Sequence, residues 1–285
     1  MLWTLWCRSR LKVINKKILF ERKDGYIMKL GFIGYGNMAQ AIAQGLVEKK
    51  VMAPSDIYAS ARDKEKLAKN TGKLGINSCY DNKEVAESCD IVVLAVKPYQ
   101  MKEVAGAVTE ELKDKLVVSI AAGVFFDDYE EILASGTHHI STVPNTPICT
   151  GEGVMVCEQT HSLSDDELNT FKEIFGKVAL LEFIETEHVS VAGTVAGCGP
   201  AFTEMYLEAL GDAAVKHGLN RAASYRLAAQ MIKGVGALYL AKGEHPGAMK
   251  DAVCSPGGTT IKGVAALERN AFRGAVIDAI DAIEG

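Results

Sequence analysis

The sequence lacks any regular arrangement of metal-binding or disulfide-forming residues. Its seven cysteines form no CxxC pair, and its six histidines show neither HxxxH spacing nor a paired Cys/His pattern. An odd, scattered set of cysteines is typical of reduced thiols in a cytosolic protein. Zinc sites need ligands at characteristic spacings, and none is present. We therefore expect a cytoplasmic protein with free thiols and no metal.

Long apolar runs are also missing. No segment approaches the roughly 18 consecutive apolar residues of a membrane-spanning helix, so no membrane association is expected. Residues 1–27 are basic, but they lack the apolar core and the small-residue cleavage site of a signal peptide. We interpret them as an extension upstream of a natural start at Met28. A transit peptide is the alternative.

Bulk positive charge is absent from the body of the chain. The formal net charge is −5, and residues 1–27 carry seven Lys/Arg against two Asp/Glu, so the remainder holds about −10. An acidic body argues against nucleic-acid binding, and an anionic ligand must be held by local groups. A chain of 285 residues, 48% hydrophobic and 24% charged, is typical of a globular protein of two domains.

Strand and helix patterns alternate between residues 28 and 183. The segment 90–96 is continuously apolar after its first residue, Asp90, as expected for a strand buried on both faces. The other strands are expected at 28–33, 56–59, near Ile76, 116–120, 139–143, 153–156 and 178–181, with helices at 41–47, 63–70, 98–111, 126–134 and 164–175. This alternation predicts a doubly wound, mostly parallel sheet with helices on both faces.

Strand signals are missing from residues 184–285. Helices are expected at 185–194, 199–217, 221–242, 246–252, 259–268 and 271–284. Several of them are apolar on more than one face, which favours an all-α domain that packs against a second copy of itself. A helical core closed within one subunit is the alternative.

A glycine-rich turn, Gly34-Tyr35-Gly36-Asn37-Met38-Ala39, joins the first strand to the first helix. GxGxxA in this context is the fingerprint of dinucleotide binding, with the pyrophosphate at the helix N-terminus. After the second strand, Ser60 and Arg62 stand where an NAD site usually has an acid, which favours the 2′-phosphate of NADP. The alternatives are a glycine-rich turn without a ligand and a solvated Arg62.

A second unusual loop, Ser255-Pro256-Gly257-Gly258, leads into Thr259-Thr260 and a helical pattern. The glycines allow close approach of the backbone, and Thr259 or Thr260 can cap the helix. A helix start of this kind attracts a carboxylate or phosphate. An ordinary turn between two helices is the other interpretation.

These motifs together resemble pyrroline-5-carboxylate reductases. The resemblance runs from Met28 to about Glu268 and is most specific from His245 to Ile261. It also rests on the glycine turn and on four further segments. These are Leu94-Ala95-Val96-Lys97-Pro98, Ala121-Ala122-Gly123-Val124, Pro144-Asn145-Thr146-Pro147 and Gly197-Cys198-Gly199-Pro200-Ala201-Phe202.

The resemblance implies a Rossmann-type domain over residues 28–183 and an all-helical dimerisation and substrate domain over residues 184–285. It implies reduction of the cyclic imino acid 1-pyrroline-5-carboxylate to L-proline by NADPH, with NADH possible, in a homodimer or a larger assembly of dimers. Cofactor contacts are implied for Gly34, Tyr35, Gly36, Asn37, Met38, Ser60, Arg62, Asn82, Ala95, Val96, Lys97, Pro98, Ala121 and Ala122. Substrate contacts are implied for Ser255, Gly257, Gly258, Thr259 and Thr260, with the Thr260 hydroxyl on the ring nitrogen as the catalytic contact.

Some positions depart from the family pattern. Cys198 replaces a usual serine, Ser190 stands where an aspartate is common, and an acid that some members use would fall near Thr186. A structural role for Lys97 at the end of its strand is favoured over a role as proton donor. A related imine reductase or β-hydroxyacid dehydrogenase is an alternative, although the latter usually needs a lysine early in the segment Gly199 to Lys216, which has none before its last residue. A silent NADP-binding regulator is a third.

Overall fold

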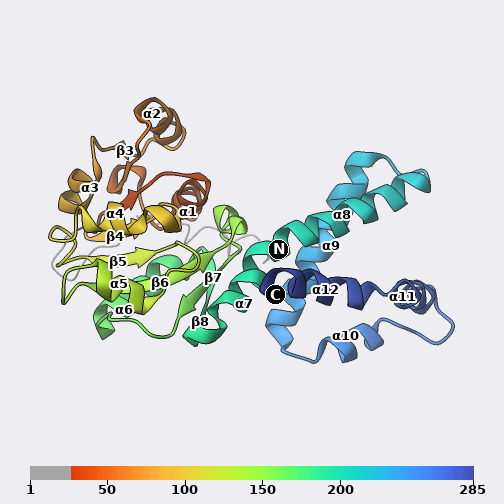
Figure 1. The fold of residues 1–285 in the computed structure, drawn as a ribbon. Helices are drawn as coiled ribbons and strands as arrows, with labels where there is room; N and C mark the ends of the chain where they lie inside the picture. The colour runs from red at the N-terminus through yellow and green to blue at the C-terminus, as the bar shows by residue number, and fades with distance from the viewer. Residues whose placement is uncertain (1–26) are drawn as a thin grey trace, which may run out of the picture.

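The computed structural model describes residues 27–285, and the expected N-terminal extension lies almost wholly outside them. An eight-stranded sheet is followed by a set of helices that extends away from it (Figure 1). The strand order is β3-β2-β1-β4-β5-β6-β7-β8. The strands from β1 to β6 pair in parallel, β7 runs antiparallel to β6, and β8 is parallel to β7. The predicted mostly parallel sheet is confirmed.

The elements of the sheet domain follow the expected alternation. The strands are β1 (Leu30–Ile33), β2 (Ile57–Ser60), β3 (Asn77–Ser78), β4 (Ile91–Leu94), β5 (Leu116–Ser119), β6 (His138–Pro144), β7 (Gly153–Glu158) and β8 (Ala179–Ile184). The α-helices are α1 (Asn37–Glu48), α2 (Lys64–Gly72), α3 (Asn82–Ser88), α4 (Met101–Gly106), α5 (Phe126–Ile132) and α6 (Asp165–Phe175). Short 3₁₀ segments are η1 (Pro54–Asp56), η2 (Pro98–Gln100) and η3 (Thr146–Thr150).

Helices cover both faces of the sheet, because its central strands are apolar on both sides. One buried cluster joins Phe32 of β1 to Leu46 of α1 and Phe171 of α6. The other joins Ile33 and Val92 to helices α3, α4 and α5. Alternate residues of β1 therefore enter different cores, as the two-residue period of a strand requires.

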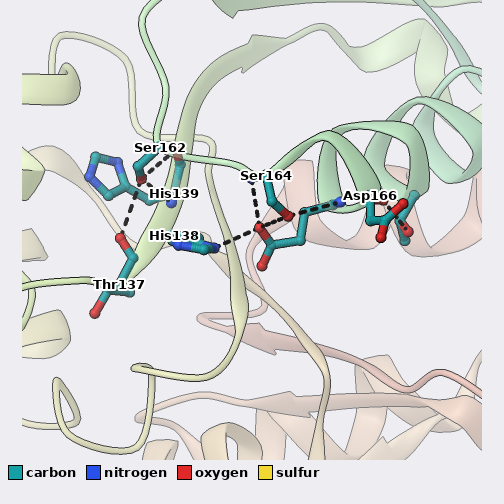
Figure 2. Close-up of polar contacts among 8 residues, drawn as sticks. Thr137, His138, His139, Ser162, Ser164 and Asp166 are labelled. Carbon is teal, nitrogen blue, oxygen red and sulfur yellow. Dashed lines mark hydrogen bonds and ion pairs between the residues drawn. The ribbon is translucent and has the colours of Figure 1, made fainter.

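Local capping sets where several helices begin. Ser164 caps α6 as predicted: its hydroxyl accepts from the amide of Glu167, and the Glu167 carboxylate accepts from the Ser164 amide. Glu167 also bonds His138 Nδ1 at 2.6 Å, which ties α6 to the start of β6 (Figure 2). Asp81 caps α3 by accepting from the amide of Glu84 at 2.9 Å.

The expected helix over residues 98–111 is wrong in length. Pro98 begins the 3₁₀ turn η2, and α4 continues to Gly106. Residues 107–115 form turns before β5. Glycine is a poor helix former, and the β-branched Val108 and Thr109 that follow it add little helical preference, so the helix ends early.

The second half is all-helical, as predicted. After η4 (Thr186–His188) come α7 (Val189–Gly193), the π-helical turn η5 (Thr194–Cys198), α8 (Gly199–Lys216), α9 (Arg221–Lys242), α10 (Pro246–Ala252), α11 (Thr259–Arg269) and α12 (Phe272–Glu284). The sequence predicted a break after residue 194, but η5 continues the helix through the glycines into α8. No helix of the described part is long and apolar enough to span a membrane.

The helical half leaves much apolar surface uncovered. Helices α8 and α9 form a hairpin that projects away from the sheet, while α12 returns to pack on α7 and η5 (Figure 1). Met205 is 71% exposed, Leu240 70% and Ile277 60%. So many exposed apolar side chains on α8, α9 and α12 point to an interaction surface.

Candidate functional site

The glycine turn after β1 has the geometry of a dinucleotide-binding turn. The Gly34 amide donates to the Ser60 carbonyl at 3.0 Å, which closes the turn over the ends of β1 and β2. Helix α1 begins beyond Gly36 without a side-chain cap, so its first amides have no side-chain acceptor. A Cβ at Gly36 would meet no atom within 4 Å, so there is open space beside the helix start. This open, uncapped N-terminus fits a pyrophosphate.

Tyr35 does not face this space. Its side chain is 5% exposed and packs in the core against Phe32. Burial raises the pKa of the Tyr35 phenol to about 12, and its hydroxyl has no hydrogen-bond partner among the described residues. A contact from Tyr35 to a cofactor is therefore restricted to its backbone.

Ser60 and Arg62 lie at the end of β2 in different environments. Ser60 is fully buried, and its hydroxyl donates to Asn82 Oδ1 at 2.8 Å. The expected direct contact of the Ser60 hydroxyl with a ribose phosphate does not match this geometry. Arg62 is exposed and has no hydrogen-bond or ion-pair partner among the described residues. Arg62 is thus the group available to an anion here, and Ser60 orients Asn82.

The ends of β4 and β5 bring further predicted residues to the same edge of the sheet. The Ala95 amide donates to the Ile33 carbonyl at 2.8 Å, placing this segment beside the glycine turn. Val96 is half-buried, whereas Lys97 and Pro98 are exposed. After β5, Ala121 is buried and Ala122 is exposed. Ligands of doubly wound sheets bind at this carboxyl edge.

The Ser255–Thr260 loop joins α10 to α11. Gly257 has a φ of +70°, and the Gly258 amide donates to the Ser255 carbonyl at 3.0 Å. A positive φ of this size favours glycine at position 257. Gly258 is the N-cap residue and makes no side-chain cap bond. The prediction that Thr259 or Thr260 caps the helix is wrong, because both lie inside its first turn.

The missing side-chain cap at the start of α11 affects what the loop can bind. Without a side-chain cap, the amides of the first turn of α11 are open to a ligand, and both threonines are exposed. Unpaired amides at a helix N-terminus favour an anion. The loop therefore offers backbone donors and hydroxyls on one exposed surface.

One subunit does not bring the two halves of the predicted site together. Helix α11 lies at the far end of the helical half from the sheet, beyond α12, and α10 lies below them in this view (Figure 1). Between the sheet and the helices, an apolar groove of about 860 Å³ is lined by β7, β8, α7, η5 and α8, with Leu180, Val191 and Val195 among its residues.

Comparisons with known proteins identify the family. A family model described as pyrroline-5-carboxylate reductase dimerisation matches residues 186–284, and one described as coenzyme F420-dependent NADP oxidoreductase matches residues 29–123. The chain is 40% identical over 259 residues to the pyrroline-5-carboxylate reductase of Treponema pallidum, covering 90% of this chain and 98% of that protein. This chain belongs to the pyrroline-5-carboxylate reductase family.

Two further relatives support the same family assignment. The Escherichia coli pyrroline-5-carboxylate reductase is 40% identical, and the match covers 88% of this chain and 94% of the relative. The crystal structure of Plasmodium falciparum pyrroline carboxylate reductase with NADP bound matches with a TM-score of 0.79 at 31% identity, covering 90% of this chain and 95% of that one. The family and the fold class that the sequence motifs indicated are confirmed.

Two buried polar groups near the sheet edge were missed by sequence reasoning in this pyrroline-5-carboxylate reductase family member. Ser119 hydrogen-bonds the Tyr129 hydroxyl, and its oxygen accepts from the Ala121 amide at 3.2 Å. Glu158, at the end of β7, is fully buried and bonds Thr186 and the Phe126 amide. The sequence signal that could have identified Glu158 is a charged residue at the end of an apolar strand, since burying such a residue without a partner is costly.

Proposed function

We propose that this protein reduces 1-pyrroline-5-carboxylate to L-proline with NADPH, the last step of proline biosynthesis. The observation that carries the proposal is the uncapped start of α11 behind the Gly257-Gly258 turn, with Thr259 and Thr260 exposed beside it. The substrate has one carboxylate and one ring nitrogen. Backbone amides suit the carboxylate, and a hydroxyl suits the nitrogen.

The nucleotide is held at the other end of the chain. Gly34, Gly36, Asn37 and Met38 bind the pyrophosphate through the start of α1, since that N-terminus is uncapped and open. Arg62 binds the 2′-phosphate, because it is an exposed cation without a partner among the described residues. Asn82 is held by Ser60 toward the adenosine side. NADH binds more weakly because it lacks the phosphate that Arg62 pairs with.

The nicotinamide end lies along the carboxyl edge, beside Ala95, Val96, Lys97 and Pro98 and near Ala121 and Ala122. NADPH, when bound, supplies a hydride to the imine carbon. The protein orients the ring by its carboxylate, donates the Thr260 hydroxyl to the ring nitrogen and excludes water. Positioning is the main catalytic contribution in such a site.

The active site needs a second subunit. Because α11 lies far from the sheet edge within one chain (Figure 1), the loop of one subunit meets the cofactor edge of another. The exposed apolar faces of α8, α9 and α12 and the groove between β8 and α7 supply the surface for a homodimer. Larger assemblies of dimers form from the same subunits, and the enzyme works in the cytoplasm.

A dehydrogenase acting on hydroxyacids is the main competing activity. Enzymes of that class use a lysine in the first long helix of the second domain, whereas α8 has its one lysine at its last residue, Lys216. The experiment follows the loss of NADPH absorbance in the presence of pyrroline-5-carboxylate. A parallel reaction with NADP and hydroxyacids follows the gain of NADPH absorbance. Turnover of the imine alone supports the proposal. Turnover of hydroxyacids, or NADPH binding without turnover, contradicts it.

A further inference from the structure

Glu158 is a buried carboxylate at the end of β7. It is the last residue of this strand and is 0% exposed. No ion pair in the described part of the chain includes it. Burying a carboxylate costs several kcal/mol unless hydrogen bonds replace its water. A residue of this kind contributes poorly to stability, so its position calls for another explanation.

Both oxygens of Glu158 accept hydrogen bonds from different parts of the fold. Oε1 accepts from the Thr186 hydroxyl at 2.7 Å, and Oε2 accepts from the Phe126 amide at 2.8 Å. Thr186 begins η4, the first turn of the helical half. Phe126 begins α5, directly after the loop 121–125. The buried Glu158 carboxylate thus links the start of α5 in the sheet domain to the start of the helical half.

The loop 121–125 is held at its other end as well. The Ala121 amide donates to Ser119 Oγ at 3.2 Å, and Ser119 hydrogen-bonds Tyr129 of α5. Phe126 also stacks on the buried His139, with ring centroids 4.8 Å apart. These contacts hold the loop and α5 together, and Glu158 joins them to Thr186.

We propose that Glu158 is a positioning residue for hydride transfer. Through its two hydrogen bonds it fixes the loop 121–125 relative to the helical half, which carries the proposed dimer surface. It so sets the position of the nicotinamide relative to the imine bound by the α11 loop of the other subunit. Charge-assisted hydrogen bonds are stronger and more directional than neutral ones, which suits a group that must fix geometry. The inference rests on the proposed function, in which Ala121 and Ala122 face the nicotinamide.

The test is a double-mutant cycle on the full-length protein with Thr186→Val and Glu158→Gln. Thr186→Val removes the hydroxyl but keeps the shape of the side chain, and Thr186→Ser restores the hydroxyl. Thr170→Val is the matched control, because the Thr170 hydroxyl donates to Asp166 within α6 and links no other element. Single-turnover kinetics separate the two relevant quantities: the amplitude gives the active fraction, and the rate constant gives hydride transfer.

We expect Thr186→Val and Glu158→Gln each to lower the single-turnover rate constant by about three- to thirtyfold. The double variant should be no slower than the slower single variant, since both changes break one linkage. The KM for NADPH should stay within about twofold, Thr186→Ser should recover most of the rate, and Thr170→Val should match the wild type. Lower amplitude with an unchanged rate constant would mean a purely structural role and overturn the proposal. So would multiplicative effects in the double variant.

Amide hydrogen exchange tests the role of Glu158 without measuring turnover, so this proposal can fail independently of the proposed function. Amide hydrogen exchange over residues 121–126 should quicken in Thr186→Val and Glu158→Gln but not in Thr170→Val. If the wild type shows no imine turnover, the proposed function fails. Unchanged exchange in the two variants overturns the linkage, whatever the activity.

Discussion

Gly34 lies against the carbonyl of Ala95: a Cβ built on Gly34 would be 2.8 Å from that oxygen. Gly34 also has a φ of +92°, which side chains rarely adopt. The glycine turn and the end of β4 are therefore packed in direct backbone contact. This contact requires glycine at position 34, and it does not depend on any ligand.

Gly34→Ala should lower the free energy of unfolding by about 2–5 kcal/mol, because it combines a strained φ with a clash against backbone. Urea unfolding measures this. Gly36→Ala is the comparison: its Cβ meets nothing within 4 Å, so the fold should keep its stability. NADPH affinity should nevertheless fall in Gly36→Ala, because the methyl group enters the pyrophosphate space. Equal stability of the two variants would contradict this distinction.

Arg62→Ala should weaken NADPH binding by about ten- to a hundredfold, since it removes a charge-assisted contact to the 2′-phosphate. NADH binding should change less than about twofold. Fluorescence titration with both nucleotides provides the measurement, and Lys69→Ala, on the helix α2 that follows Arg62, controls for the loss of one positive charge. An equal loss for both nucleotides would exclude Arg62 from the phosphate site.

Thr260→Ala should lower kcat/KM for the imine by roughly ten- to a thousandfold, or about 1.4–4 kcal/mol of transition-state stabilisation. The amides of the first turn of α11 remain, so the substrate carboxylate should still bind. Thr260→Ser should keep most of the activity because it keeps the hydroxyl. Steady-state kinetics that give Thr260→Ala the wild-type kcat/KM would remove the hydroxyl from the mechanism.

Glu167 should make stability depend on acid pH. Burial alone would raise its pKa, but hydrogen bonds from Ser164 and His138 outweigh this and hold the pKa of Glu167 below its usual 4.5. A lowered carboxyl pKa stabilises the fold above the usual value, and this contribution is lost as the pH falls through the folded-state pKa.

Glu167→Gln isolates this charge, because glutamine can keep the capping bond to the Ser164 amide. The variant should melt below the wild type near neutral pH, and the difference should shrink as the pH falls below 4.5. Thermal melts across this range measure the effect. A difference that is constant with pH would contradict it.

The sequence predicted the elements that depend on local pattern. The apolar run after Asp90 became the central strand β4, and Ser164 became the cap of α6, because strand burial and capping follow from a few neighbouring residues. The family motifs at Gly34 and Gly257 also marked turns that favour glycine, because both residues have a positive φ. In both places the requirement comes from backbone geometry that is local in sequence.

Other features depend on contacts between distant residues. The reversed direction of β7, the burial of the Ser60 hydroxyl on Asn82 and the inward side chain of Tyr35 are set by packing. The link from Glu158 to Thr186 joins residues 28 positions apart and has no motif. The separation of the Ser255–Thr260 loop from the sheet edge likewise appears when the helices are placed in space (Figure 1).

The most direct test of the central claim is the fate of the hydride. The wild-type protein is incubated with 1-pyrroline-5-carboxylate and NADPH deuterated at the transferred position of C4, and the product is examined by mass spectrometry and NMR. The account predicts L-proline with one deuterium at C5, the former imine carbon. Proline without deuterium, or no proline despite bound NADPH, would contradict it.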